Sequence, residues 1–169
     1  MIDLSYYAKI RLYVLNDLFS TKTIELNIKQ SHYLTKVMRK KIQDTILTFN
    51  SDNGEFLAEI QSYNKKLVSV EVIKKVRNPE EKTDVWILFT PVKKTPTEYI
   101  IQKATELGVS KILPIITERT ITKSLNLKRF QDIAIEASEQ CERITIPEIF
   151  PLQKLYDVID KWVDKRTIY

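Results

Sequence analysis

The stretch VWILFTPVKKTPTEYIIQKATELGVSKILPII, residues 85–116, decides the fold of the second half of the chain. It opens with an apolar run at residues 85–89 and closes with another at residues 111–116. Runs that are apolar on both faces are typical of buried parallel strands, whereas half-exposed strands alternate apolar and polar residues. The two runs therefore predict neighbouring parallel strands in an α/β domain.

The residues between these runs predict a helix with clear end signals. Thr95 is expected as the N-cap, Pro96 as the first helical residue, and Glu98 as the partner that completes a capping box. Gly108 follows the last apolar position, where a glycine commonly ends a helix. The whole stretch thus predicts a strand, helix, strand unit.

The first half of the chain follows a different pattern. Apolar residues alternate with polar ones over residues 56–60 and 68–72, as in half-buried antiparallel strands. Asn53 and Gly54 are suited to the positive-φ positions of a hairpin turn. Together with the strand before this turn and short segments at residues 9–14 and 24–28, this gives about five strands, a number that fits a small antiparallel β-barrel.

A charged run around Pro79 interrupts the apolar pattern and indicates a domain boundary. We expect a barrel at residues 1–76, a linker at 77–84 and a partial α/β domain at 85–169. The second domain is expected to contain two further helices, at about residues 128–142 and 152–165.

Composition excludes several classes of site. The 169 residues include one cysteine, Cys141, and one histidine, His32, so neither an internal disulfide nor a Cys/His zinc site is expected. With only two glycines, a glycine-rich phosphate loop cannot form. No apolar run reaches the roughly 18 to 20 residues of a membrane span, and the N-terminus lacks a secretory pattern, so we expect a cytoplasmic protein without membrane or metal partners.

Basic residues exceed acidic ones by five, and most of the excess lies in the first 80 residues, with 13 basic and 9 acidic side chains. Part of it falls on a helix predicted to start at Ser31 as N-cap. Its apolar stripe comprises Leu34, Val37 and Met38, and its opposite stripe comprises His32, Lys36, Arg39 and Lys40. The cationic stripe is either an ordinary solvated surface or a binding face for a polyanion, which Arg11 would extend.

Two mixed polar stripes occur on the helices of the second half. They comprise Tyr99, Gln102, Lys103 and Glu106 on the first helix, and Glu136, Glu139, Gln140 and Arg143 on the second. Arg119 follows the second apolar strand, at the sheet end where α/β domains bind ligands. The alternative is that both stripes simply face water and that Glu139 and Arg143 form an ordinary i, i+4 pair.

Several motifs resemble the RsmE family of 16S ribosomal RNA uridine N3-methyltransferases. The segment at residues 101–109 resembles the family's IQKATELGV motif, and residues 117–119 resemble its TER segment. Residues 133–148 resemble its IAIEAAEQ helix with the following arginine and PE pair, while residues 32–39 resemble its HL..VLR segment. The likeness is co-linear over residues 9–150.

This resemblance implies a PUA-like barrel that grips RNA, followed by a SPOUT methyltransferase domain that uses S-adenosylmethionine and commonly acts as a homodimer. The substrate implied is a uridine N3 in 16S ribosomal RNA of the small ribosomal subunit. The RNA contacts implied are Arg11, His32, Lys36, Arg39 and Lys40. The residues implied at the catalytic site are Gln102, Lys103, Arg119, Glu139, Gln140 and Arg143.

The chain also departs from the family pattern. The GPEGG and LGxRILRxETA segments, which form the family's knot and hold its cofactor, are absent. We therefore expect a C-terminally truncated SPOUT domain that does not bind S-adenosylmethionine alone and leaves apolar surface uncovered. Gln43 and Glu142 stand where the family usually has glycine, and Gln43 is expected to alter a turn. The alternative function is a non-catalytic RNA-binding protein or decaying remnant that uses only the barrel.

Overall fold

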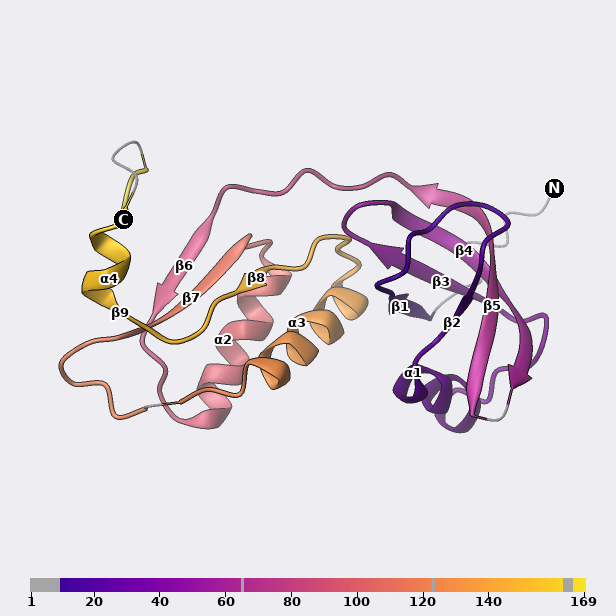
Figure 1. The fold of residues 1–169 in the computed structure, drawn as a ribbon, viewed down its shortest axis with the longest axis horizontal. Helices are drawn as coiled ribbons and strands as arrows, with labels where there is room; N and C mark the ends of the chain where they lie inside the picture. The colour runs from indigo at the N-terminus through magenta and orange to yellow at the C-terminus, as the bar shows by residue number, and fades with distance from the viewer. Residues whose placement is uncertain (1–9, 65, 123, 163–165) are drawn as a thin grey trace. The chain divides into compact units, whose positions relative to one another are not determined.

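The computed structural model describes residues 10–64, 66–122, 124–162 and 166–169, and divides into two compact units (Figure 1). Unit 1 comprises residues 1–81 and 142–145, and unit 2 comprises residues 82–141 and 146–169. The chain therefore leaves unit 1, returns to it briefly at residue 142, and leaves again. The division predicted from the sequence, with consecutive domains, does not include this return of residues 142–145 to unit 1.

Unit 1 contains a five-stranded sheet in the order β1-β3-β4-β5-β2. The strands are β1 (Arg11–Tyr13), β2 (Thr23–Glu25), β3 (Thr45–Asn50), β4 (Gly54–Asn64) and β5 (Leu67–Arg77). The predicted alternation is confirmed, since Phe56, Ala58 and Ile60 on β4 are buried in one core with Val68, Val70 and Val72 on β5. The expectation of purely antiparallel pairing is wrong, because β1 and β3 run parallel. A long connection through β2 and a helix separates them, and such a crossover is what parallel pairing requires.

The β3–β4 hairpin is as predicted, but only one of its two turn residues has positive φ. Gly54 has φ +93, and a Cβ there would lie 2.3 Å from the carbonyl oxygen of Arg77. Asn53 is not among the residues with positive φ. Its side-chain oxygen instead accepts hydrogen bonds from the Leu18 N–H and the Asn50 amide, at 3.0 and 2.9 Å. Gly54 is thus required both by its backbone angle and by the close approach of β5.

The helical segment of unit 1 starts earlier than predicted. It consists of α1 (Ile28–His32) followed by a π-helical turn, η2 (Tyr33–Val37). Asn27, not Ser31, is the N-cap, and it forms a capping box with Gln30. Ser31 is 1 % exposed, and its hydroxyl donates to the Leu26 carbonyl at 3.2 Å and accepts from the Val68 N–H at 2.9 Å. Ser31 therefore ties the helix to β5 instead of starting it.

Unit 2 confirms the predicted strand, helix, strand unit. Its elements are β6 (Trp86–Phe89), α2 (Lys94–Glu106), β7 (Lys111–Ile116), α3 (Leu127–Cys141), β8 (Glu148–Ile149), β9 (Gln153–Lys154) and α4 (Leu155–Ile159). Strands β6 and β8 pair with β7 in parallel, and so does β9. The last helix, α4, is shorter than the helix predicted over residues 152–165, and residues 163–165 of that prediction lie outside the described part.

The start of α2 also differs from the prediction. The helix begins at Lys94 with Lys93 at the N-cap position, and no side chain caps it. Thr95 is therefore inside the helix, and the hydroxyl of buried Thr97 accepts from the N–H of Val92 at 3.1 Å. Gly108, with φ +81, follows the helix end as expected.

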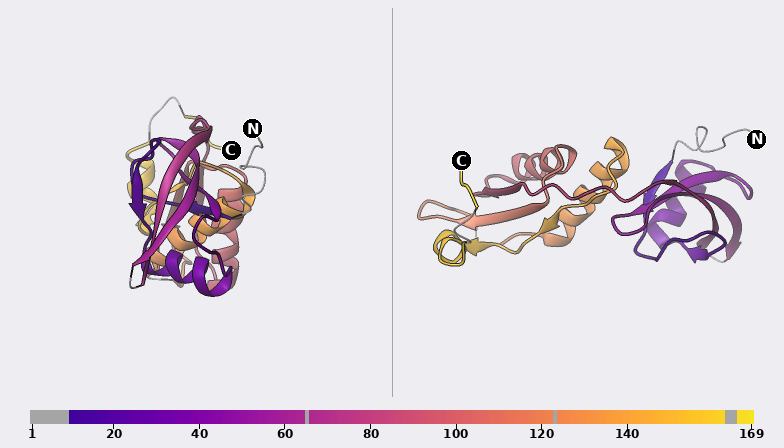
Figure 2. Two further views of the ribbon diagram at one scale, coloured as in Figure 1. Left: turned by 90° about the vertical axis from the view of Figure 1, so that its right-hand side faces the viewer. Right: turned by 90° about the horizontal axis from the view of Figure 1, so that it is seen from above.

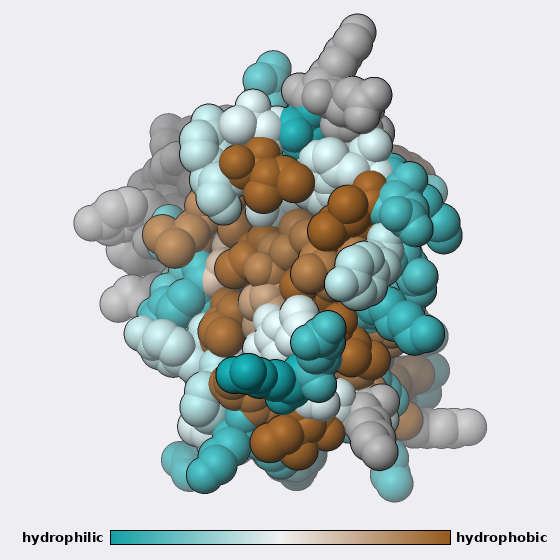
Figure 3. All heavy atoms as spheres, turned by 90° about the vertical axis from the view of Figure 1, so that its left-hand side faces the viewer, coloured by the Kyte–Doolittle hydropathy of each residue, from teal (hydrophilic) through white to brown (hydrophobic). Residues whose placement is uncertain are grey.

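The two faces of the unit 2 sheet are covered differently. Helices α2 and α3 pack over one face, where Ile101, Ile112 and Phe130 share a core. On the other face, Leu113 and Ile115 pack against Val158 of α4, so that α2 and α4 lie on opposite sides of the strands (Figure 2). Seen from the side on which α4 lies in Figure 1, apolar side chains gather at the surface (Figure 3).

Within the described residues, no helix is both long and apolar enough to cross a membrane. The same residues contain no group of three or more His, Cys, Asp or Glu side chains that could hold a metal ion.

Candidate functional site

The predicted basic face lies on the outside of α1 and η2. His32, Lys36 and Arg39 are exposed and Lys40 is half-buried, while Leu34 beneath them is 0 % exposed. Buried Ser31 and Leu34 hold the segment on the sheet, so the cationic side chains are left at the surface. The predicted exposure of His32, Lys36 and Arg39 is confirmed, while their use as one face that binds RNA stays a prediction.

Apolar side chains lie among these cations, contrary to the predicted stripe. Val37 is 59 % exposed and Met38 is 41 % exposed, although the helical spacing predicts that both are buried with Leu34. The reason is the π-helical turn, in which the Met38 N–H donates to the Tyr33 carbonyl at 2.9 Å, five residues back. The wider turn breaks the α-helical spacing, so only Leu34 of the three reaches the core.

Over residues 33–42 the exposed apolar side chains are Tyr33, Val37, Met38 and Ile42. We call these four side chains, together with His32, Lys36, Arg39 and Lys40, the basic-apolar face. Arg39 has φ +51, so it ends the helical segment in the left-handed conformation. Tyr63 on β4 fixes the following residue, since its hydroxyl donates to the Lys40 carbonyl at 2.7 Å. Burial, and after it the Asp44 carboxylate, raises the pKa of Tyr63, which keeps this donor protonated.

Arg11 does not extend this face. Its side chain is 6 % exposed, and its Nε donates to Glu55 Oε1 at 2.5 Å. Its guanidinium also lies over the ring of Phe49, 4.3 Å from the ring centre. The expectation that Arg11 adds to an exposed basic patch is therefore wrong, because β1 turns the side chain inward, toward the buried Glu55.

On α2, the stripe predicted from the sequence forms one local cluster around Glu106. Gln102 Nε2 donates to Glu106 Oε1 at 2.9 Å, and Lys103 Nζ donates to Glu106 Oε2 at 2.7 Å. Lys103 also lies 5.5 Å from the ring centre of Tyr99. The hydrogen bond with Lys103 lowers the pKa of Glu106, and the same bond raises the pKa of Lys103. Lys103 is thus held as a cation and is not suited to accept a proton near neutral pH.

Chain topology places most of the predicted catalytic residues at one end of unit 2. Helices α2 and α3 both run back against the strands, so their last turns lie near the start of β7. Gln102 and Lys103 near the end of α2, and Glu139 and Gln140 near the end of α3, therefore share this end. Gln140 is exposed and Glu139 is half-buried.

Arg119 lies at the other end of the sheet. It is exposed in the turn that follows β7, where the Thr117 N–H donates to the Thr120 hydroxyl at 2.8 Å. The six-residue strand β7, about 20 Å long at ordinary strand rise, separates this turn from the end that carries Lys103. Within unit 2, Arg119 is therefore not a neighbour of the Glu106 cluster.

Arg143 belongs to unit 1, in the returning segment 142–145. Its Nε is buried and has no hydrogen-bond partner. Elsewhere in the described residues, the Thr48 hydroxyl is also buried without a partner. Sequence reasoning missed Glu55, which is 3 % exposed and carries a charge into the interior beside this segment. No periodicity marks Glu55, since it stands in the hairpin just before the alternating residues of β4.

Comparisons with known proteins match both halves of the chain. Residues 79–169 match the family model described as RNA methyltransferase domain, and residues 26–73 match the one described as RNA methyltransferase PUA domain. Ribosomal RNA small subunit methyltransferase E of Rickettsia conorii is 34 % identical over 152 residues, which are 89 % of this chain and 62 % of that protein. The chain belongs to the RsmE family of RNA methyltransferases.

Further RsmE proteins agree with this assignment. The enzyme of the same name from Buchnera aphidicola subsp. Acyrthosiphon pisum is 34 % identical over 146 residues, which cover 82 % of this chain and 58 % of that one. The crystal structure of the Neisseria gonorrhoeae RsmE protein bound to S-adenosyl methionine superposes with a TM-score of 0.83 at 25 % identity, covering 92 % of this chain and 66 % of that chain. The chain thus spans about three fifths of the length of these curated relatives.

The two positions where RsmE proteins usually have glycine both have left-handed backbone here. Gln43 has φ +73 and Glu142 has φ +62. The expectation that Gln43 alters its turn stays a prediction. In this turn the Gln43 N–H donates to the Ile60 carbonyl at 2.8 Å. These two residues are held in a conformation that costs an L-amino acid roughly 1 to 2 kcal/mol.

Two polar side chains of the site implied by the resemblance are already engaged with a neighbour. S-adenosylmethionine would need a concave site with polar groups left to bind it. Gln102 and Lys103 already bind Glu106 at the surface of α2, where the Lys103 side chain is 40 % exposed. In this arrangement each of the two side chains gives one hydrogen bond to Glu106.

Proposed function

We propose that this chain serves S-adenosylmethionine-dependent methylation of ribosomal RNA, with unit 1 binding the RNA and unit 2 supplying part of the methyltransferase domain. The observation that carries the proposal is the basic-apolar face in a chain whose two halves match the RNA methyltransferase PUA and catalytic domain models. The finer assignment, N3 of a uridine in 16S ribosomal RNA of the small subunit, rests on the resemblance of its motifs.

The make-up of the basic-apolar face favours unpaired RNA. Exposed Lys36 and Arg39 can neutralise phosphates, and Arg39 can bind one in a bidentate manner. Exposed Tyr33 and Met38 lie within a few residues of them and offer surfaces on which unstacked bases can rest. A duplex hides its base faces, so this combination suits a loop or single-stranded segment.

In unit 2, the charge pattern limits what each predicted catalytic residue can do. Lys103 is held as a cation by Glu106, so it can attract a phosphate or a negative nucleobase but is not suited to act as the base that deprotonates uridine N3. Glu106, whose pKa is lowered, is a carboxylate near neutral pH and an acceptor only. Glu139 and Gln140 lie at the same end of the helical layer and are proposed to line the site with them.

We expect the chain alone not to bind S-adenosylmethionine, since its α2 polar groups are already satisfied by one another. Isothermal titration of the full chain with S-adenosylmethionine tests this expectation. Micromolar binding would overturn it and would mean that this chain contains a site for the cofactor.

RNA binding is tested by the salt dependence of the affinity for a single-stranded 16S ribosomal RNA fragment. Lys36→Ala and Arg39→Ala should each weaken binding and reduce the slope of log K against log salt by about 0.7 to 1 for each phosphate that is no longer neutralised. Lys128→Ala, which removes an exposed cation from α3, is the matched control and should change neither. Unchanged slopes for both unit 1 variants would remove the basic-apolar face from the proposal.

The contribution of the apolar side chains is tested separately. Met38→Ala should weaken binding to single-stranded RNA by several-fold without changing the salt slope, because the substitution removes no charge. Binding to a duplex of the same sequence should be unaffected. An equal loss for both RNAs would argue against base contacts on this face.

A further inference from the structure

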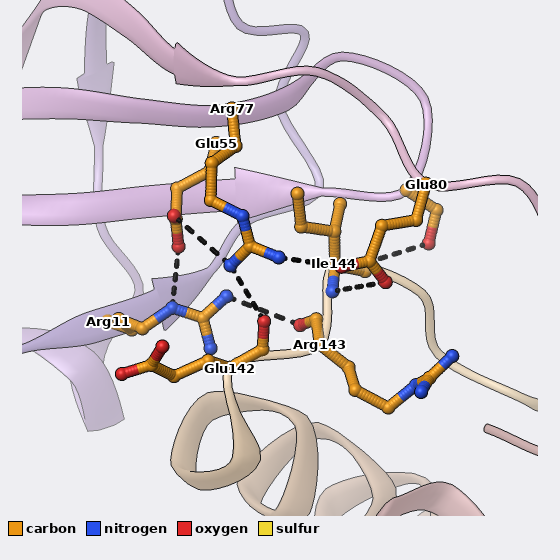
Figure 4. Close-up of polar contacts among 8 residues, drawn as sticks. Arg11, Glu55, Arg77, Glu80, Glu142, Arg143 and Ile144 are labelled. Atoms are coloured by element: carbon orange, nitrogen blue, oxygen red, sulfur yellow. Dashed lines mark hydrogen bonds and ion pairs between the residues drawn. The ribbon is translucent and has the colours of Figure 1, made fainter. Parts of the chain in front are cut away.

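The segment 142–145, which returns from unit 2, is held on unit 1 mainly through its backbone (Figure 4). Arg77 Nη1 donates to the Glu142 carbonyl at 2.8 Å, and Arg11 Nη2 donates to the Arg143 carbonyl at 3.3 Å. The N–H of Ile144 donates to Glu80 Oε2 at 3.3 Å, and the Ser51 hydroxyl donates to the Ile144 carbonyl at 3.4 Å. The Ile144 side chain is 0 % exposed, so one apolar anchor accompanies these polar contacts.

The groups that hold this backbone are themselves fixed by one another. Glu55 Oε1 accepts from Arg11 at 2.5 Å, and its other oxygen lies 3.6 Å from Arg77 Nη1. Arg77 Nη2 donates to Glu80 Oε1 at 2.6 Å. Each guanidinium therefore faces a carboxylate on one side and a carbonyl of the returning segment on the other. The planar fork of arginine, with five donors, allows both contacts at once.

We propose that Arg11, Glu55, Arg77 and Glu80 form a clamp that docks residues 142–145 on unit 1 and thereby positions Arg143. These four are positioning residues, since they act through the backbone of the segment. The proposal concerns docking of the segment and stands whether or not the chain methylates RNA.

The geometry at Arg143 supports a positioning role. Its carbonyl faces Arg11, while its side chain points away from the clamp (Figure 4). The buried Nε has no hydrogen-bond partner, so the clamp presents an arginine with an unused donor. The left-handed backbone at Glu142, with φ +62, makes the bend that brings the segment onto unit 1. Holding the two carbonyls that follow this bend, those of Glu142 and Arg143, fixes the direction in which the Arg143 side chain leaves the backbone.

Burial explains why the clamp can act as a rigid support. The Arg11 and Glu55 side chains are only 6 % and 4 % exposed, and Arg11 also stacks on Phe49 in the interior. A charge-assisted pair shielded from solvent is screened little by salt, unlike an exposed pair. Arg77 and Glu80, at 39 % and 30 % exposure, form the outer part of the clamp and can be changed without burying an unpaired charge.

The test uses the outer pair, because substitution at Glu55 would leave the buried Arg11 without its partner and could unfold unit 1. Arg77→Met and Glu80→Ala are made in the full chain and digested with trypsin under native conditions. Trypsin cuts after Arg143 only when the segment leaves unit 1, so the cleavage rate reports the undocked population. Loss of a charge-assisted hydrogen bond should raise that rate by about tenfold.

Matched controls separate docking from general loss of stability. Lys75→Met removes a cation two residues from Arg77 on the same strand, and Glu81→Ala removes the exposed carboxylate next to Glu80. Both should leave cleavage after Arg143 unchanged. Hydrogen exchange should show faster exchange at the Ile144 amide in the two clamp variants and unchanged protection of Val70 in β5.

Three outcomes would overturn the proposal. The first is an unchanged cleavage rate after Arg143 in both clamp variants, and the second is an equal increase in the controls. The third is a parallel loss of protection at Val70, which would mean that these charges stabilise the sheet as a whole and do not specifically dock the segment.

Discussion

Replacing Gln43 by glycine should stabilise unit 1. Gln43 is exposed and has φ +73, a left-handed conformation that costs an L-residue roughly 1 to 2 kcal/mol and costs glycine nothing. Against this, the greater conformational freedom of glycine stabilises the unfolded state by about 0.4 to 1 kcal/mol. The net gain in unfolding free energy should therefore be about 0.5 to 1 kcal/mol. The backbone bond from the Gln43 N–H to the Ile60 carbonyl does not involve the side chain and remains.

The measurement is thermal denaturation of the full chain, followed by far-ultraviolet circular dichroism and complemented by hydrogen exchange of β4 amides. For a unit of this size a gain of that order should raise the melting temperature by about 2 to 8 °C. Gln43→Ala is the matched control, because it removes the same side chain but keeps the Cβ that makes the conformation costly. If Gln43→Ala stabilises as much as Gln43→Gly, or if glycine destabilises, backbone strain is not the reason for the difference.

Four further predictions concern individual residues or pairs of residues. Ser31→Ala should destabilise unit 1 by about 1 to 3 kcal/mol, because it leaves the buried Val68 N–H unpaired. The control Thr35→Ala removes a partly exposed hydroxyl that donates to the Ser31 carbonyl, and it should cost less. Equal losses of unfolding free energy in the two variants would contradict the anchoring role of Ser31. In a carboxyl NMR titration, Lys103→Met should raise the pKa of Glu106 back toward its ordinary value of 4.5, and an unmoved pKa would disprove the ion pair. Because Lys103 has a raised pKa and Glu106 a lowered one, their ion pair contributes fully to stability between about pH 4.5 and about pH 10.5. The contribution is lost as pH falls through the folded-state pKa of Glu106, and also as pH rises through the folded-state pKa of Lys103. Trp86 and Trp162 both lie in unit 2, with ring centres 5.9 Å apart, so tryptophan fluorescence should follow unit 2 alone and be insensitive to Ser31→Ala if the units unfold separately.

Local sequence patterns predicted the elements well where one interaction dominates. The apolar runs at residues 85–89 and 111–116 became the parallel strands β6 and β7, because each side of such a strand must be covered. Alternation over β4 and β5 became a sheet with one buried face. The wrong predictions came where several local arrangements compete, as at Ser31 and Thr95, whose hydroxyls could each have capped a helix. Tertiary contacts made Ser31 a buried bridge to β5 instead.

The candidate site shows the same division. The sequence correctly predicted that His32, Lys36 and Arg39 are exposed, because a charged side chain needs only a place at the surface. It did not predict the exposure of Val37 and Met38, because these residues follow a π-helical turn. Such a turn differs from an α-helix by one residue in its hydrogen-bond spacing, and no residue type indicates that difference.

By itself the sequence determined the RsmE family, the strand, helix, strand unit of the second half and the strand pattern of the first. Each depends on residues close together in the chain, where periodicity and motif spacing are decisive. The tertiary structure alone decided that Arg11 turns inward to Glu55 and that residues 142–145 return to unit 1. Those interactions join residues more than 40 and more than 130 positions apart, so burial and charge pairing in the folded chain, rather than any local pattern, determine them.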